Sequence, residues 1–173
     1  NNEKVLEDVR DLLIDAVREK RPVSPASEWL LDNFYLIEEQ IEIGKRHLPK
    51  GYSKNLPKLA NATHEELPRV YAIALDIIAH SDGKFSITNL NAFIESYQTV
   101  AALTLGELWA VPIMLRLALI ENLRRVASQV ALDRIDKNNA NYWAQKFIDT
   151  SRKKSGRIIL EMAEMVRSSP RSE

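Results

Sequence analysis

Apolar residues recur along the chain at intervals of three and four, the period of an amphipathic helix, and no segment alternates convincingly like a strand. In the first expected helix, Glu3–Lys20, they form one stripe with charged residues on the other faces. The second expected helix ends at Arg46 and begins with Ser24 as its N-cap and Pro25 at its first position. The pattern therefore predicts a helical amino-terminal part.

The remainder of the chain shows the same period. A loop is expected over Leu48–Thr63, because this section contains two prolines and a glycine. Thr104 and Glu107 have the spacing of a capping box, which predicts a helix start at this point. Four further helices are expected, over Glu65–His80, Thr88–Val100, Thr104–Asp133 and Asn139–Val166.

About six helices joined by mostly short connections favour antiparallel packing of neighbours. We expect an all-α fold, an irregular and partly orthogonal bundle. The helices are expected to form a single domain over residues 1–167, followed by a frayed tail over 168–173 that is rich in serine.

Composition indicates a globular domain, with 45% hydrophobic and 28% charged residues among 173. Lys+Arg and Asp+Glu both number 24, so the balance gives no general attraction to nucleic acid. The chain has no cysteine, and its three histidines are scattered. None of the five glycines forms a phosphate-binding loop. We therefore expect no nucleic-acid partner, no metal and no cofactor in this chain.

The most apolar stretch, Leu105–Ile120, is expected to be a buried core helix. Glu107, Pro112 and Arg116 interrupt it, whereas a membrane span needs ~20 predominantly apolar residues. We therefore expect no direct membrane insertion by this segment. The chain begins at Asn1 without an initiator methionine, which favours a piece of a longer protein.

Arg116 lies inside this apolar stretch, and a buried arginine needs a carboxylate partner. Glu121 is poorly spaced for that role at i+5, whereas a carboxylate on another helix, such as Glu28 or Asp32, fits better. An ion-pair network that fixes helix geometry is favoured over an acid/base site, and no catalytic residue is assigned. The expected members are Glu28, Asp32, Glu107, Arg116 and Glu121.

The aromatic residues offer a second candidate surface. Trp29, Tyr71 and Trp109 fall on or beside apolar stripes, so they are expected in the core. Tyr35 and Tyr52 are the candidates for exposed aromatic side chains that contact a partner.

Four segments together resemble the amino-terminal region of cyclic β-1,2-glucan synthases. The resemblance covers about Arg21–Val130, and several separate motifs recur in order. The segments are SPASEWLLDNFYLIEEQI (24–41), LPKGYSKNLPKL (48–59), PRVYAIALDIIAHSDGKF (68–85) and LTLGELWAVPIMLRLALIENLRRVA (103–127).

The resemblance implies a parent enzyme much larger than this chain. Members of the family are large inner-membrane proteins that polymerise glucose from UDP-glucose on a protein-linked primer and cyclise the product. Metal-dependent transfer belongs to a separate region with Asp-rich motifs that this chain lacks. The resemblance thus implies a scaffold or adaptor segment on the cytoplasmic side of the bacterial inner membrane, with the remainder of the parent as its partner.

Two other functions stay open. One is a module that binds β-1,2-glucan and guides the growing chain. The other is a hydrolase that uses Glu28 and Asp32, which share one helix face. Glycosidase carboxylates flank their substrate from opposite sides, so the hydrolase is the least favoured of the three.

Overall fold

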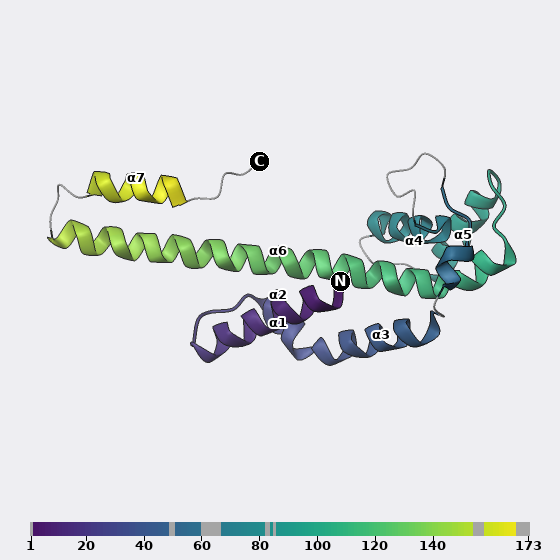
Figure 1. The fold of residues 1–173 in the computed structure, drawn as a ribbon, viewed down its shortest axis with the longest axis horizontal. Coiled ribbons are helices and arrows are strands. Elements are labelled where there is room, and N and C mark those ends of the chain that lie inside the picture. The colour runs from purple at the N-terminus through teal and green to yellow at the C-terminus, as the bar shows by residue number, and fades with distance from the viewer. Residues whose placement is uncertain are drawn as a thin grey trace. The chain divides into compact units, whose positions relative to one another are not determined.

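The computed structural model describes residues 2–48, 51–59, 67–81, 84, 86–153 and 158–168. All regular structure in these residues is helical, apart from an isolated bridge between Lys58 and Pro68. The all-α prediction is therefore confirmed (Figure 1). The helices are α1 (Asn2–Arg18), α2 (Pro25–Asp32), α3 (Phe34–His47), the 3₁₀ turn η1 (Tyr52–Asn55), α4 (Arg69–His80), α5 (Ile87–Gln98), α6 (Leu105–Lys153) and α7 (Ile158–Ser168).

The chain divides into two compact units, Asn1–Ser128 and Gln129–Glu173. The sequence predicts instead a single helical domain over residues 1–167. Helix α6 contributes residues to both units. Most of the tail expected at 168–173 lies outside the described residues, which end at Ser168.

The single helix expected between Ser24 and Arg46 is two helices, which meet at Asn33. The amide nitrogen of the Asn33 side chain donates a hydrogen bond of 2.8 Å to the carbonyl of Trp29. Its backbone leaves the helical region, with φ −107° and ψ 10°. Asparagine competes in this way for helix carbonyls, which explains the break. The predicted start is confirmed, because Ser24 Oγ accepts the backbone N–H of Ser27 at 3.2 Å.

Between the helices expected at 104–133 and 139–166, the sequence predicts a break that the structure lacks. Helix α6 runs without interruption through residues 134–138, and a separate α7 follows it. The connecting residues contain neither glycine nor proline, so no local signal ends the helix there. Pro112 lies inside α6, where it removes one intrahelical hydrogen bond.

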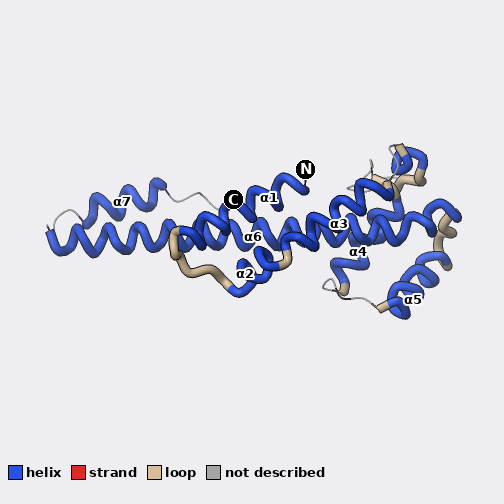
Figure 2. The backbone as a smooth tube through the Cα atoms, turned by 90° about the horizontal axis from the view of Figure 1, so that it is seen from below, coloured by secondary structure: helices blue, strands red, loops and turns tan. Residues whose placement is uncertain are grey.

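The core of the first unit lies between α4 and α6, which run side by side in Figures 1 and 2. Helix α3 approaches α6 closely, since a Cβ atom added to Gly44 would lie 3.5 Å from Leu117. The main buried residues are Leu56, Val70, Ile73, Ala74, Ile77, Ile78, Leu103, Ala110, Val111, Met114, Leu115 and Ala118.

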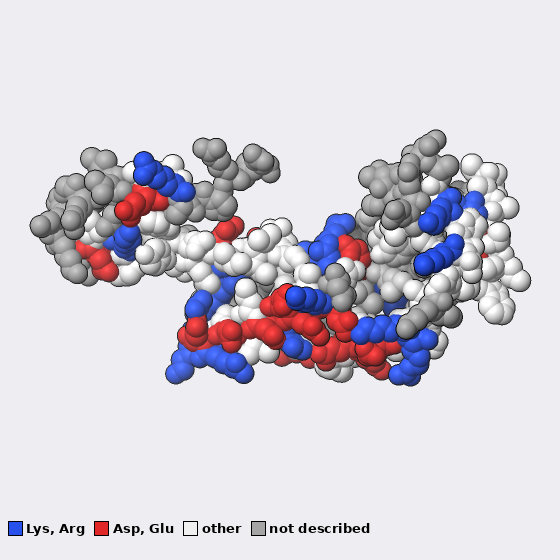
Figure 3. Space-filling view, viewed as in Figure 1, with Lys and Arg blue, Asp and Glu red and all other residues white. Residues whose placement is uncertain are grey.

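Helices α1 and α3 are antiparallel, as their cross-helix ion pairs show. Glu3 pairs with Lys45 at 2.8 Å, and Arg10 pairs with Glu38 at 2.9 Å. The Arg10 guanidinium also lies 4.8 Å from the centre of the Phe34 ring. Figure 3 shows acidic side chains gathered over these helices with basic ones among them. Charge pairing on the surface therefore accompanies the apolar packing of α1.

In the second unit, α7 lies beside the carboxyl-terminal part of α6 (Figures 1 and 2). Lys146 of α6 pairs with Glu164 of α7 at 3.1 Å. The Lys146 Nζ also lies 4.7 Å from the centre of the Trp143 ring, and Trp143 stacks obliquely on Phe147. The ion pair joins the two helices of this unit, and the two ring contacts lie within α6.

Residues 105–120 differ from the fully buried helix that the sequence predicts, because only one side of this part of α6 is buried. Met114 is 2% exposed, whereas Trp109 is 78% exposed and Leu105 70%. None of the helices in the described residues combines the length and apolar character needed to cross a membrane.

Met114 and Leu119, two residues of similar size on α6, test whether only one side of this helix is buried. We expect Met114→Ala to lower the free energy of unfolding by about 2–5 kcal/mol, because it leaves a cavity in the core. Leu119 is 37% exposed, so Leu119→Ala should cost less than about 1.5 kcal/mol. Urea unfolding followed by circular dichroism measures both. Equal losses would contradict the one-sided burial of α6.

Candidate functional site

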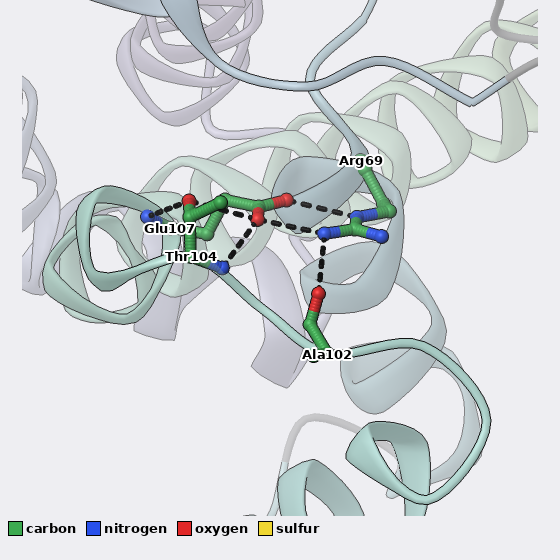
Figure 4. A network of polar contacts seen from close by, with 4 residues as sticks. All are labelled: Arg69, Ala102, Thr104 and Glu107. Atoms are coloured by element: carbon green, nitrogen blue, oxygen red, sulfur yellow. Dashed lines mark hydrogen bonds and ion pairs between the residues drawn. The ribbon is translucent and has the colours of Figure 1, made fainter.

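The best-defined polar cluster of the described residues joins Arg69 of α4 to Glu107 of α6 (Figure 4). The Glu107 side chain is fully buried, and the Arg69 side chain is 17% exposed. Arg69 Nε donates to Glu107 Oε1 at 2.9 Å, and Arg69 NH2 donates to Oε2 at 2.7 Å. This two-bond geometry is the strong form of an arginine–carboxylate contact.

The local sequence at the start of α6 positions Glu107. Thr104 Oγ1 accepts the Glu107 backbone N–H at 3.3 Å, while Glu107 Oε2 accepts the Thr104 backbone N–H at 2.8 Å. The Thr104 hydroxyl also donates to the same oxygen at 3.0 Å. The predicted capping box is therefore confirmed. Its carboxylate also accepts hydrogen bonds from a cation on another helix.

Arg69 is held by contacts on several sides. It is the first residue of α4, and its backbone N–H donates to the Pro57 carbonyl at 2.7 Å. Its guanidinium donates to the Ala102 carbonyl at 3.1 Å and lies 6.0 Å from the centre of the Tyr97 ring. The arginine thus links the loop before α4, the end of α5 and the start of α6.

The electrostatics of the pair favour both charged forms. Burial by itself raises the pKa of Glu107, but the hydrogen bonds from Arg69 and Thr104 outweigh it, and the pKa lies below its ordinary value. The hydrogen bond to Glu107 raises the pKa of Arg69 further. The pair therefore stays ionised at neutral pH.

The five residues expected to form one ion-pair network lie apart in the structure, and two of them pair with other arginines. Glu107 pairs with Arg69. Glu121 pairs with Arg124 at 2.7 Å, and this contact lowers the pKa of Glu121. The Arg116 side chain is half-buried and forms no ion pair or hydrogen bond with the described residues. Neither Glu28 nor Asp32 approaches Arg116 in an ion pair; both are exposed on α2.

Sequence reasoning missed Arg69, which lies 38 residues from its partner. No helical spacing connects two positions so far apart. The available signal was that Glu107, as the acidic member of a capping box within an apolar run, would be buried and would need a cation.

The aromatic residues also depart from expectation. Tyr35 is 64% exposed, as predicted. Tyr52 is half-buried, and its hydroxyl donates to the Gly106 carbonyl at 2.9 Å. Trp29 and Trp109 were expected in the core but are 56% and 78% exposed. Both lie on the outer side of helices whose opposite side faces the core.

The cluster is built to hold helices together. Both oxygens of Glu107 are engaged by hydrogen bonds, and its side chain has no exposed surface. A general acid or base must reach its substrate, which this carboxylate does not. Within the described ranges, no group of three or more His, Cys, Asp or Glu residues has the arrangement of a metal site.

The chain was compared with protein-family models and with known proteins. No family model matches it. It is 36% identical over 142 residues to the cyclic beta-(1,2)-glucan synthase NdvB of Rhizobium meliloti (strain 1021), an alignment that covers 82% of this chain. The chain belongs to the cyclic β-(1,2)-glucan synthase family. It spans about 5% of the length of that family member, so it corresponds to one small segment of the relative.

Removal of the Glu107 charge should destabilise the folded state. We expect Glu107→Gln to lower the free energy of unfolding by about 3 kcal/mol, because it leaves the Arg69 guanidinium without its buried counterion. The matched control is Glu121→Gln in the partly exposed pair with Arg124, which should cost less than about 1 kcal/mol. Chemical unfolding of the three proteins at neutral pH gives the comparison. Similar losses in both variants would refute a special role for the buried pair.

The pair should also make stability depend on pH. Because the folded-state pKa of Glu107 lies below the ordinary value of 4.5, its contribution is complete above that pH and is lost as pH falls through the lowered pKa. The stability difference between the wild type and Glu107→Gln should therefore shrink on acidification. Urea midpoints at a series of acidic pH values measure it; a constant difference would show that the carboxylate does not titrate as expected.

Proposed function

We propose that this chain is a non-catalytic helical scaffold segment of a cyclic β-1,2-glucan synthase, which packs against the remainder of its parent polypeptide. The parent transfers glucose from UDP-glucose, and the nucleotide sugar and its metal bind in another region. The proposed location is the cytoplasmic side of the bacterial inner membrane, as part of a membrane-bound parent.

The observation that carries this proposal is the apolar surface of the first unit. Helix α5 and the start of α6 expose several large hydrophobic side chains, and large exposed patches of this kind mark interaction sites. The most exposed examples are Ile87 of α5, Val100 in the connection after it, and Leu105 and Trp109 of α6.

The contacts of the carboxylates support the same proposal. Glu107 and Glu121 are engaged with arginines, so they act in packing. Glu28 and Asp32 are exposed on one short helix, which suits solvation better than the two-sided attack of a glycosidase.

A glucan-binding module is the second candidate. Trp29 and Tyr35 are both exposed, one on each side of the break at Asn33. Aromatic faces suit the C–H faces of glucose, so these residues provide a specific reason to test for a bound glucan.

Titration calorimetry separates the two candidates. We expect the isolated chain to give no heat of binding with UDP-glucose plus magnesium, or with linear β-1,2-glucan oligosaccharides. Micromolar binding of the nucleotide sugar would overturn the scaffold proposal. Binding of the oligosaccharide alone, lost in Trp29→Ala and kept in Tyr142→Ala, would establish the second candidate instead.

The parent synthase provides the complementary measurement. In the full-length enzyme, Glu107→Gln should reduce the amount of active synthase without changing the KM for UDP-glucose, because the substrate site lies elsewhere. Glu121→Gln is the control and should leave both unchanged. A raised KM with undiminished amount would place Glu107 near the substrate and contradict the scaffold role.

A further inference from the structure

One stripe along α6 carries apolar residues that face away from its core. It consists of positions spaced alternately by four and three residues, so they share one face of the helix. The stripe is Leu105, Trp109, Pro112, Arg116, Leu119 and Leu123. Its two amino-terminal members, Leu105 and Trp109, are more than two-thirds exposed.

A groove of about 490 Å³ runs along the carboxyl-terminal part of this stripe, from Pro112 to Leu123, with walls from α3 and α5. Leu36 and Ile37 of α3 and Leu90 of α5 line it together with residues of α6. Helix α5 buries none of its residues and carries a single charged side chain, Glu95. The described lining of the groove is thus mainly apolar, with Leu90 as the contribution of α5.

Arg116 lies in the middle of the stripe, and Gln40 is the only other polar side chain among the described residues that line the groove. The side chain of Arg116 is half-buried, and no ion pair or hydrogen bond joins the guanidinium to the described part of the chain. A cation surrounded by apolar side chains is stabilised by a carboxylate that arrives with its own apolar neighbours.

We propose that this groove binds one amphipathic helix from the remainder of the synthase polypeptide, with apolar residues at intervals of three and four around a single carboxylate that pairs with Arg116. Binding of an apolar helix face in a hydrophobic groove is a recurrent mode of recognition. The inference rests on the proposed scaffold function and names the surface and the chemistry of its partner.

The charge distribution favours this occupant over others. A second copy that packed this same face against itself would bring no carboxylate to Arg116, because neither the stripe nor the described lining of the groove contains Asp or Glu. A lipid places its headgroup charge at one end of its apolar part, whereas Arg116 has apolar residues on both sides. A glucan needs many hydrogen-bonding side chains, and the described lining of this groove provides two, Arg116 and Gln40.

The test uses site-specific photo-cross-linking in the full-length synthase. A benzophenone amino acid replaces Trp109 or Leu119, and exposed Lys4 of α1 serves as the control position. We expect both stripe positions to cross-link within one polypeptide to the same peptide outside these 173 residues. That peptide should carry one acidic residue between apolar residues at helical spacing, and Lys4 should not reach it.

Charge reversal then tests the ion pair. Arg116→Glu should abolish the cross-link, whereas Lys4→Glu should preserve it. A lysine in place of the acidic residue of the mapped peptide should restore the cross-link in the Arg116→Glu enzyme. Because no described residue pairs with Arg116, the isolated Arg116→Glu chain should keep the melting temperature of the wild type, which excludes misfolding as the cause.

Other outcomes overturn the inference in distinguishable ways. Cross-links from the stripe to a second copy, to lipid or to glucan would identify a different occupant. If neither stripe position cross-links, but benzophenone at Trp29 or Tyr35 cross-links to the remainder of the synthase, the scaffold function stands and the groove is not the contact surface. If all four positions stay silent, the scaffold function fails as well.

Discussion

The contact between Arg69 and Glu107 is the constraint on which the first unit depends. It joins the first residue of α4 to the first turn of α6, so the two helices that form the core begin at fixed points beside each other. Glu107 is favourable at a helix start, whereas a cation such as Arg69 is unfavourable there. The carboxylate therefore compensates the charge of one helix start while it caps another, and its complete burial makes any other arrangement costly.

Local signals in the sequence predicted the helices and their caps. Ser24 and the Thr104–Glu107 box mark helix starts in the structure because each depends on residues within one turn. The break at Asn33 could not be placed, because a helix and its interruption differ there by one side-chain hydrogen bond. The partner of Glu107 could not be found either, since only the packed structure brings Arg69 across the intervening residues.

The prediction that residues 105–120 are buried on all sides is wrong for a physical reason. A helix that is apolar on all sides needs cover on all sides, but the cover need not come from its own domain. Here α4 covers the side with Met114, and the side with Trp109 is exposed. The chain corresponds to about 5% of the length of its relative in the family, and the side with Trp109 is the one for which we propose cover from other parts of the synthase.

The ion pairs between α1 and α3 give this unit a graded response to ionic strength. Lys45 lies between Glu3 and Glu42, and all three side chains have access to solvent. Salt screens such exposed charges within about one Debye length, ~8 Å at physiological strength, while buried pairs are screened much less. Rising salt should thus loosen α1 from α3 before it disturbs Arg69 and Glu107. Separation of α1 from α3, visible as faster amide exchange in α1, would precede global unfolding.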